Sequence, residues 1–259
     1  METSEYENGT PCWVDLGTPD VAAAAAFYSG LFGWEIEIGP AEMGHYSMAT
    51  VGGLPVAAIA DQQTPGAVYW TTYLSTDDVD ATFAKAKAAG VTVFVEPMDV
   101  MAFGRMAVIA DSGGAPVSFW QAGEHRGAGL VNEPGTLCWN ELTTRAVEES
   151  KTFYAAACGL TTTTHPHLMG DYYEFHTVSG RRVAGMMPMV GDMWPADLPN
   201  HWMVYFAVDD VDAAAKRCTE LGGNVAVSPT DIPPGRFSVL NHPQGGFFSV
   251  IKLAIPPGT

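Results

Sequence analysis

The feature that most constrains this chain is an internal duplication. The segment Cys12–Trp34 reads CWVDLGTPDVAAAAAFYSGLFGW, and most of its pattern returns as CWNELTTRAVEESKTFYAAACGL at Cys138–Leu160. Trp13 and Trp139 are 126 positions apart, and the Phe-Tyr pair of each segment keeps the same offset. A repeat of this length predicts two similar domains of roughly 125 residues each, which is an ordinary domain size.

Each copy predicts a strand, a helix and three strands, twice over. In the first copy Trp13–Leu16 alternates bulky and polar residues, Thr18-Pro19-Asp20 can cap a helix, and an apolar stripe then runs to Gly33. A weaker echo of this unit spans Trp70 to Ala89. Further strands are expected at 45–51, 56–59, 91–95, 105–110 and 116–121, and in the second copy at 172–178, 183–187, 202–208, 236–240 and 247–252.

This order of elements predicts an α+β fold in which each domain contains two βαβββ modules. The modules form one curved mixed sheet with helices on one face only, and the uncovered concave face encloses a cup. We expect a disordered N-terminal tail at 1–10, the first domain at 11–121, a linker at 122–135, the second domain at 136–254 and a tail at 255–259. The linker assignment depends on four Gly and one Pro between Ala122 and Gly135.

Composition excludes several classes of partner. The net charge is −17 with only 12 Lys and Arg, so the chain lacks the basic surface that nucleic acid requires. We interpret the acidity as a contribution to solubility, and attraction of a cationic ligand is the alternative. No apolar run approaches the ~20 residues that span a bilayer, and the four cysteines form no C-x-x-C. We therefore expect no membrane partner and a cytoplasmic protein with reduced thiols.

Two carboxylates at matching places are candidates for chemistry. Asp15 follows Trp13 by two residues, and Glu141 follows Trp139 by two, so strand alternation directs each acid toward the cup with its Trp. Each acid can be a general acid or base, or a counter-ion for a cationic ligand. The alternative is a structural carboxylate that accepts hydrogen bonds from Tyr, Arg or the backbone.

Aromatic side chains and one acid–histidine pair share the expected cup faces. Tyr73 and Tyr205 occupy equivalent strands, and Trp120 lies on the last strand of the first copy. These rings can stack on a planar ligand or fill a core. Glu174 and His176 alternate on one strand, where they can act as base and orienter in proton transfer or can be an exposed polar face.

The pattern resembles the vicinal oxygen chelate superfamily, which includes glyoxalases, bleomycin-resistance proteins and extradiol dioxygenases. The resemblance covers about 12–253 and implies tandem glyoxalase-like domains. It is carried by Phe27-Tyr28 with Gly33-Trp34, Phe153-Tyr154 with Gly159, the Asp-Asp-Val-Asp caps at 77–80 and 209–212, Gly104-Arg105 with Asp111-Ser112-Gly113-Gly114, and Gly235-Arg236 with His242-Pro243-Gln244-Gly245.

The resemblance also implies a divalent metal held by His, Glu or Gln on the first and last strands of each module. The matching positions hold Trp13, Thr71 and Ser118 in the first copy, Trp139, Met203 and Ser249 in the second, and residues near Ala57 and near Ala184 or Gly185. None of these is an ordinary metal ligand, because zinc and iron require imidazole, carboxylate or thiolate donors. We therefore predict no metal site and no cofactor.

These observations favour a metal-independent protein that binds a small secondary-metabolite-like or antibiotic-like molecule, of the glyoxalase/bleomycin-resistance type. The expected ligand-binding residues are Trp13, Tyr73, Trp120, Trp139, Met203 and Tyr205. One alternative is a metal-free isomerase, lyase or cyclase in which Asp15, Glu141, Glu174 or His176 transfers the proton. A second alternative is a structural or interaction module with plugged cups. A monomer and a homodimer are both compatible with the duplication.

Overall fold

The computed structural model describes residues 1–63, 66, 68–166, 171–192 and 194–254, so the tail expected at 255–259 lies outside it. The first domain contains β1 (Pro11–Thr18), α1 (Val21–Phe32), β2 (Glu35–Ile36), the 3-10 turn η1 (Ala41–Met43), β3 (Ser47–Val51), β4 (Leu54–Asp61), β5 (Tyr69–Ser75), α2 (Val79–Ala88), β6 (Thr92–Val100), β7 (Gly104–Ala110) and β8 (Pro116–Ala122). The second contains β9 (Leu137–Thr144), α3 (Val147–Cys158), β10 (Thr161–His165), β11 (Tyr172–His176), β12 (Arg182–Pro188), β13 (His201–Ala207), α4 (Val211–Glu220), β14 (Asn224–Ile232), β15 (Gly235–Asn241) and β16 (Phe247–Leu253).

The two domains have the same sheet topology, and the predicted α+β fold with paired βαβββ modules is confirmed. The strand order is β2-β3-β4-β1-β5-β8-β7-β6 in the first sheet and β10-β11-β12-β9-β13-β16-β15-β14 in the second. In each sheet the opening strands of the two modules pair antiparallel at the centre, β1 with β5 and β9 with β13. Each opening strand also pairs in parallel with the last strand of its own module, which makes the sheets mixed.

Helix starts follow the capping residues in the sequence. Asp20, Asp78 and Asp210 each accept a hydrogen bond from the backbone amide three residues later, at 2.9 to 3.0 Å. The second copy has Ala146 at the corresponding place before α3, which makes no side-chain cap. The glutamates at 148 and 149 in the first turn of α3 provide the negative charge that a helix N-terminus favours.

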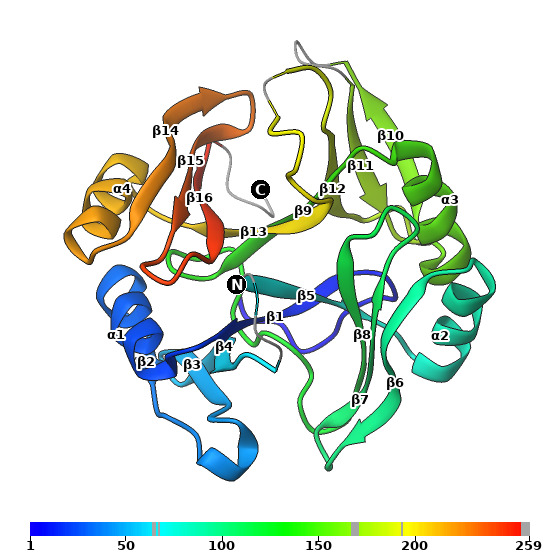
Figure 1. The fold of residues 1–259 in the computed structure, drawn as a ribbon, viewed down its shortest axis with the longest axis horizontal. Helices are drawn as coiled ribbons and strands as arrows, with labels where there is room; N and C mark the ends of the chain where they lie inside the picture. Colours follow the sequence, from blue (N-terminus) through cyan, green and yellow to red (C-terminus); the bar gives the residue numbers. More distant parts are fainter. Residues whose placement is uncertain (64–65, 67, 167–170, 193, 255–259) are drawn as a thin grey trace.

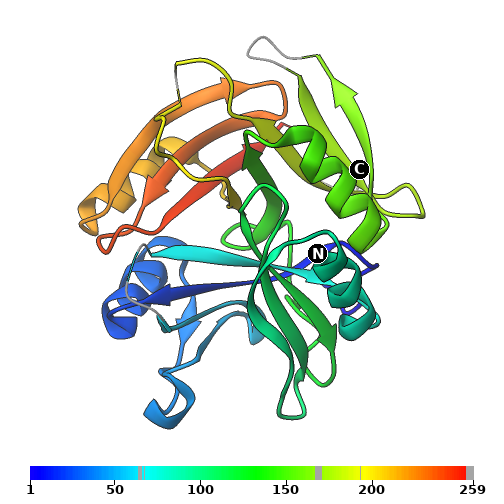
Figure 2. The ribbon, with the colours of Figure 1, turned by 45° about the vertical axis from the view of Figure 1, so that its right-hand side comes forward.

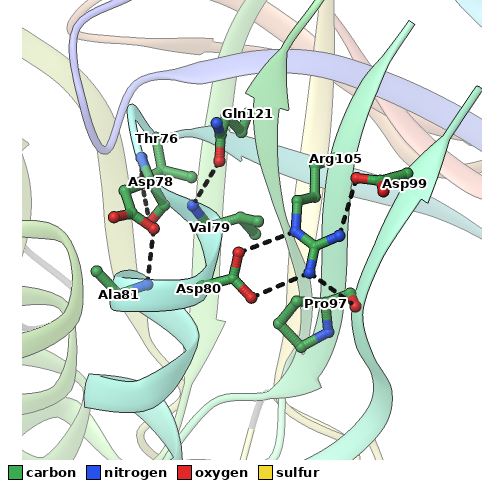
Figure 3. Close-up of polar contacts among 9 residues, drawn as sticks. All are labelled: Thr76, Asp78, Val79, Asp80, Ala81, Pro97, Asp99, Arg105 and Gln121. Atoms are coloured by element: carbon green, nitrogen blue, oxygen red, sulfur yellow. Dashed lines mark hydrogen bonds and ion pairs between the residues drawn. The ribbon is translucent and has the colours of Figure 1, made fainter. Parts of the chain in front are cut away.

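In each sheet one arginine, which follows a glycine in both copies, links the outer hairpin to a helix. Arg105 on β7 forms a bidentate pair with Asp80 of α2, at 2.9 and 3.0 Å, and contacts Asp99 of β6 at 2.8 Å (Figure 3). Arg236 repeats this arrangement with Asp212 and Asp231. A planar guanidinium has its N–H donors in a fixed arrangement and can bind two carboxylates at once. These contacts therefore hold the outer hairpins in place.

The helix-bearing faces of the two sheets pack against each other. Helix α1 lies beside α4 at one flank, and α2 lies beside α3 at the other (Figures 1 and 2). One shared core joins Phe27 and Tyr28 of the first domain with Phe206 and Phe248 of the second. Because both helix faces are buried in this interface, the two concave faces open on opposite outer sides of the molecule (Figure 1).

A buried polar contact also fixes the two sheets relative to each other. The side-chain amide of Asn140 on β9 donates to the Thr72 hydroxyl on β5, at 2.9 Å. Both residues are at most 1% exposed. A buried donor must find such a partner or lose the free energy of its hydration, so this bond selects one docking of the domains.

Two parts of the fold differ from the expectation. Residues 1–10, expected to be disordered, lie along the linker: the Thr3 amide donates to the Gly129 carbonyl at 3.1 Å, and Glu2 forms a β-bridge with Leu130. The strand ranges expected from the sequence do not include β10, which ends at His165. This strand is a run of four threonines, a β-branched residue that favours strands but gives no alternation.

Candidate ligand-binding cups

The first cup is built around the carboxylate of Asp15. One of its oxygens accepts a hydrogen bond from the Tyr73 hydroxyl at 2.7 Å and lies 3.4 Å from the Tyr46 hydroxyl. The Trp13 indole N–H in turn donates to the Tyr46 oxygen at 2.9 Å. Desolvation outweighs the tyrosine hydrogen bonds and raises the pKa of Asp15 to about 6.

The second cup repeats this network around Glu141. The Tyr205 hydroxyl donates to the Glu141 carboxylate at 3.0 Å, and the Trp139 indole N–H donates to the Tyr172 oxygen at 3.2 Å. Burial raises the pKa of Glu141, while hydrogen bonds from Tyr172 and Tyr205 oppose that rise. The structure therefore brings three predicted residues, Trp139, Glu141 and Tyr205, into one contact network.

The sequence reasoning missed the tyrosine that links the indole to the carboxylate in each cup. Tyr46 and Tyr172 are 126 positions apart, the same offset as the two tryptophans. Extending the comparison of the two copies to polar residues would have found them.

Gly185 leaves the space that Tyr172 occupies. Strand pairing places Gly185 directly beside Glu141. A Cβ atom at this position would lie 1.9 Å from the Tyr172 hydroxyl oxygen and 2.9 Å from the Trp139 indole nitrogen. Only glycine lets the Tyr172 hydroxyl cross the floor of this cup.

Glu174 forms a second charged group in the second cup. Its carboxylate lies 3.0 Å from His165 Nε2, 3.8 Å from His176 Nε2 and 3.0 Å from the Arg182 guanidinium. The Arg182 guanidinium also lies 5.4 Å from the centroid of the Trp139 ring. The predicted pair Glu174–His176 is thus adjacent, but His165 is the closer histidine.

The two carboxylates of the second cup lie on one face of its sheet, on either side of Gly185 and the Tyr172 hydroxyl next to it. Glu174 pairs with Gly185, which pairs with Glu141, so the acids lie on the same face two strands apart. Two strand spacings separate their backbones by roughly 10 Å. Met203 pairs with Glu141 from the other side, which places this predicted residue at the end of the same row.

The first cup differs at these positions and is filled with apolar side chains. Position 48, which corresponds to Glu174, is a methionine. Trp13 and Trp120 are 2% and 6% exposed and pack with Ala58 and Ala128 in one cluster, with Tyr73 also in it. In this cup the aromatic side chains pack as a small core, which is the alternative interpretation of these residues.

The side chains at the expected metal positions do not fit a divalent ion. Strand pairing places Thr71 beside Asp15, and Ser118 and Ser249 beside the two cup tyrosines. On the remaining strands the cup residues are Ala58 and Gly185, since Ala57 and Ala184 lie in the core between the domains. In the described part of the chain, no group of three His, Cys, Asp or Glu is arranged to hold a metal.

The fold and the paired cups define a tandem glyoxalase-like protein. The family model "Glyoxalase/Bleomycin resistance protein/Dioxygenase superfamily" matches residues 12–119, and the model "Glyoxalase-like domain" matches residues 139–251. The chain therefore belongs to the glyoxalase/bleomycin resistance/dioxygenase superfamily, as the resemblance in the sequence predicted.

Two curated relatives match nearly end to end. "Putative glyoxylase CFP32" of Mycobacterium tuberculosis is 47% identical over 97% of each chain. "Anthracycline biosynthesis protein DnrV" of Streptomyces peucetius is 38% identical over 96% of this chain and 95% of that protein.

Solved structures share the fold at low sequence identity. The Mn(II)-bound glyoxalase from Novosphingobium aromaticivorans superimposes with a TM-score of 0.64 and 16% identity, over 96% of this chain and 86% of that one. Homoprotocatechuate 2,3-dioxygenase from Arthrobacter globiformis gives a TM-score of 0.68 and 15% identity, over 98% and 82%. At such identities the likeness shows the fold alone. No helix within the described residues is long and apolar enough to cross a membrane.

Proposed function

We propose that the protein binds a small organic molecule in the second cup, without a metal ion. The observation that carries this proposal is the lining of that cup: a buried carboxylate, Glu141, lies two strands from a second acid, Glu174, with glycine between them. The Trp139 and Tyr172 rings provide partly exposed apolar faces beside these acids. Such a site favours a flat molecule that carries hydrogen-bond donors or a positive charge.

The relatives support a small-molecule ligand of this kind. One is named for anthracycline biosynthesis and another as a glyoxylase. We propose a secondary-metabolite-like ligand, whose planar rings would lie against Trp139. We also propose that the protein is cytoplasmic, where its free cysteines would stay reduced.

A second candidate function is proton transfer by a metal-independent isomerase, lyase or cyclase. It is favoured by Glu174, which is only 14% exposed in its side chain and lies beside two histidines and Arg182. Arg182 would stabilise the carboxylate, and His165 could exchange a proton with it across 3.0 Å. In this mechanism Glu174 removes a proton from the ligand, and Glu141 with its tyrosines holds the ligand in place.

A thermal-shift screen with matched variants tests the binding proposal. The panel contains planar polyketide-like quinones, small aldehydes and aromatic amines. Glu141→Gln and Glu174→Gln should remove the stabilisation by a hit, while Asp15→Asn, the matching change in the first cup, should keep it. A ligand at 100 times its Kd adds about 2.7 kcal/mol, which a melting experiment resolves. A hit that survives both second-cup variants would contradict the site.

Two further measurements separate the alternatives. Elemental analysis of untagged protein should find far less than one divalent ion per chain; one tightly held ion per domain would refute metal independence. Solvent hydrogen exchange into a bound hit, followed by mass spectrometry, tests proton transfer. Exchange that Glu174→Gln abolishes while binding persists would establish the enzyme over the binding protein.

A further inference from the structure

The amino-terminal residues and the linker run side by side. The Thr3 amide donates to the Gly129 carbonyl, and the Val131 amide donates to the Met1 carbonyl at 3.1 Å. The terminal ammonium of Met1 contacts the Glu133 carboxylate at 2.7 Å. These contacts pair the first three residues with Gly129–Val131, about 130 positions away. We call the two segments, residues 1–10 and 123–131, the strap.

Backbone hydrogen bonds join the linker half of the strap to strands of the first cup. The Ala128 amide donates to the Cys12 carbonyl at 2.8 Å, and the Gly129 amide donates to the Pro55 carbonyl at 2.7 Å. Ala128 is 1% exposed and belongs to the apolar cluster of the cup. The strap is thus hydrogen-bonded to both β1 and β4.

A histidine of the strap covers the two cup tryptophans. The His125 ring lies 4.4 Å from the Trp13 ring, edge to face, and 5.7 Å from the Trp120 ring. The Trp120 indole N–H donates to the His125 carbonyl at 2.9 Å. Burial lowers the pKa of His125, so the ring is neutral at pH 7 and sits on the indoles as an aromatic group.

Tyr6 closes the strap from the amino-terminal side. Its hydroxyl donates to the Ala128 carbonyl at 2.7 Å, and its ring packs on the cup cluster. Desolvation raises the pKa of this phenol, which keeps it protonated and able to donate. The strap therefore places two rings, the Tyr6 phenol and the His125 imidazole, on the apolar side chains of the first cup.

The second cup has no such cover among the described residues. Cys138 and Trp139 are partly exposed, whereas their counterparts Cys12 and Trp13 are 1% and 2% exposed. The linker residues that precede β9 turn toward the domain interface instead, where the Gly135 carbonyl accepts a hydrogen bond from the Trp34 indole. The asymmetry between the cups thus follows from the path of the linker.

We propose that the strap occupies the first cup as a built-in ligand, so that the protein has one open ligand site, in the second cup. The assignment of a ligand to the second cup rests on the proposed function. The occupation of the first cup by the strap does not, and it can be tested without any ligand.

The thiols Cys12 and Cys138 provide an internal comparison for this test. They occupy equivalent positions, burial raises the pKa of both thiols, and each lies near a backbone carbonyl of the neighbouring strand. Only Cys12 lies under the strap. Labelling of the full-length native protein with N-ethylmaleimide, read by peptide mass spectrometry, should modify Cys138 at least tenfold faster than Cys12.

Opening the strap should remove this difference. In a Tyr6→Ala, His125→Gly double variant we expect the labelling rate of Cys12 to rise at least tenfold, with that of Cys138 unchanged. Equal rates in the native protein, or a protected Cys12 in a folded variant with the strap opened, would overturn the proposal. A faster labelling rate at both thiols would indicate general unfolding of the variant. The proposal is then tested on the native protein alone, by hydrogen exchange.

Hydrogen exchange in the native protein gives this test without a substitution. The amides of Thr3, Ala128, Gly129 and Val131 should exchange at least 100-fold more slowly than in an unstructured peptide, because each donates to a backbone carbonyl. Exchange at peptide rates would show that the strap does not stay in the cup. If the strap is protected and no ligand binds the second cup, the proposed function fails while this inference holds.

Discussion

His242 should make the contact between the two domains sensitive to acid. Its side chain is 1% exposed and lies against the first domain, with ring centroids 6.0 Å from Phe27 and 5.7 Å from Tyr28. Nδ1 accepts a hydrogen bond from the Gln244 amide at 3.1 Å, so the proton of the neutral ring is on Nε2. A charge on this ring would have to be accommodated among aromatic side chains.

Burial lowers the pKa of His242 from 6.5 to about 4. Between these values the unfolded chain binds a proton that the folded protein does not bind. The contribution of the neutral His242 to the free energy of unfolding is therefore fully present above pH 6.5, and it is lost as the pH drops toward 4. A shift of roughly 2.5 units corresponds to about 3 kcal/mol at 1.36 kcal/mol per unit.

Urea unfolding at a series of pH values between 8 and 4 measures this loss. We compare the protein with His242→Gln, which has a side chain that does not titrate. The other buried acids titrate equally in both proteins and cancel in the difference. The difference in unfolding free energy between the two should change by about 3 kcal/mol across this range. A constant difference would refute the assignment of a neutral, buried imidazole.

Two substitutions test other parts of the structure. Tyr154→Phe should destabilise the protein by about 1–3 kcal/mol in urea unfolding, because its hydroxyl donates to the buried Asp111 carboxylate at 2.8 Å. The matched Tyr28→Phe should cost less, because among the described residues its hydroxyl contacts no carboxylate; equal costs would contradict this. Gly185→Ala should displace Tyr172 and abolish ligand stabilisation in the thermal-shift assay while the protein still folds, and unchanged binding would show that this tyrosine is not part of the site.

The fold could be predicted because its signals are local and repeated. Helix-ending glycines and strand alternation occur in all four modules at matching positions, and capping aspartates occur in three of them, so each module supports the others. The pairing of Trp13 with Asp15 and of Trp139 with Glu141 on the cup faces followed from strand alternation alone.

The difference between the cups could not be predicted in this way. The bond from Tyr6 to Ala128 joins residues 122 positions apart, and neither segment shows a periodic pattern. A glycine-rich segment after a domain is typical of a linker. No local sequence pattern indicates that this linker packs against the first cup. The contact of His165 with Glu174 was missed for a similar reason, since a run of threonines does not alternate.

Asp15 allows a test of whether the carboxylate in the closed cup costs stability. Its pKa is about 6 in the folded protein and 3.8 without burial, so the unfolded chain releases its proton first as the pH rises. The contribution of the protonated Asp15 to the free energy of unfolding is fully present below pH 3.8, and about 3 kcal/mol is lost as the pH rises through 6. Asp15→Asn lacks this fall, which pH-dependent urea unfolding would detect; an unchanged pH profile would show that Asp15 is ionised at no cost.

The effects of Asp15 and His242 oppose each other between pH 4 and 6. As the pH drops in this range, Asp15 adds stability and His242 removes it, by about the same amount. As far as these two groups are concerned, the free energy of unfolding of the unaltered protein should change little between pH 4 and 6. Removing either group should tilt the profile, with Asp15→Asn losing stability toward acid and His242→Gln gaining it. Tilts of the same sign would mean that at least one of these groups is ionised in the folded protein, where burial favours its neutral form.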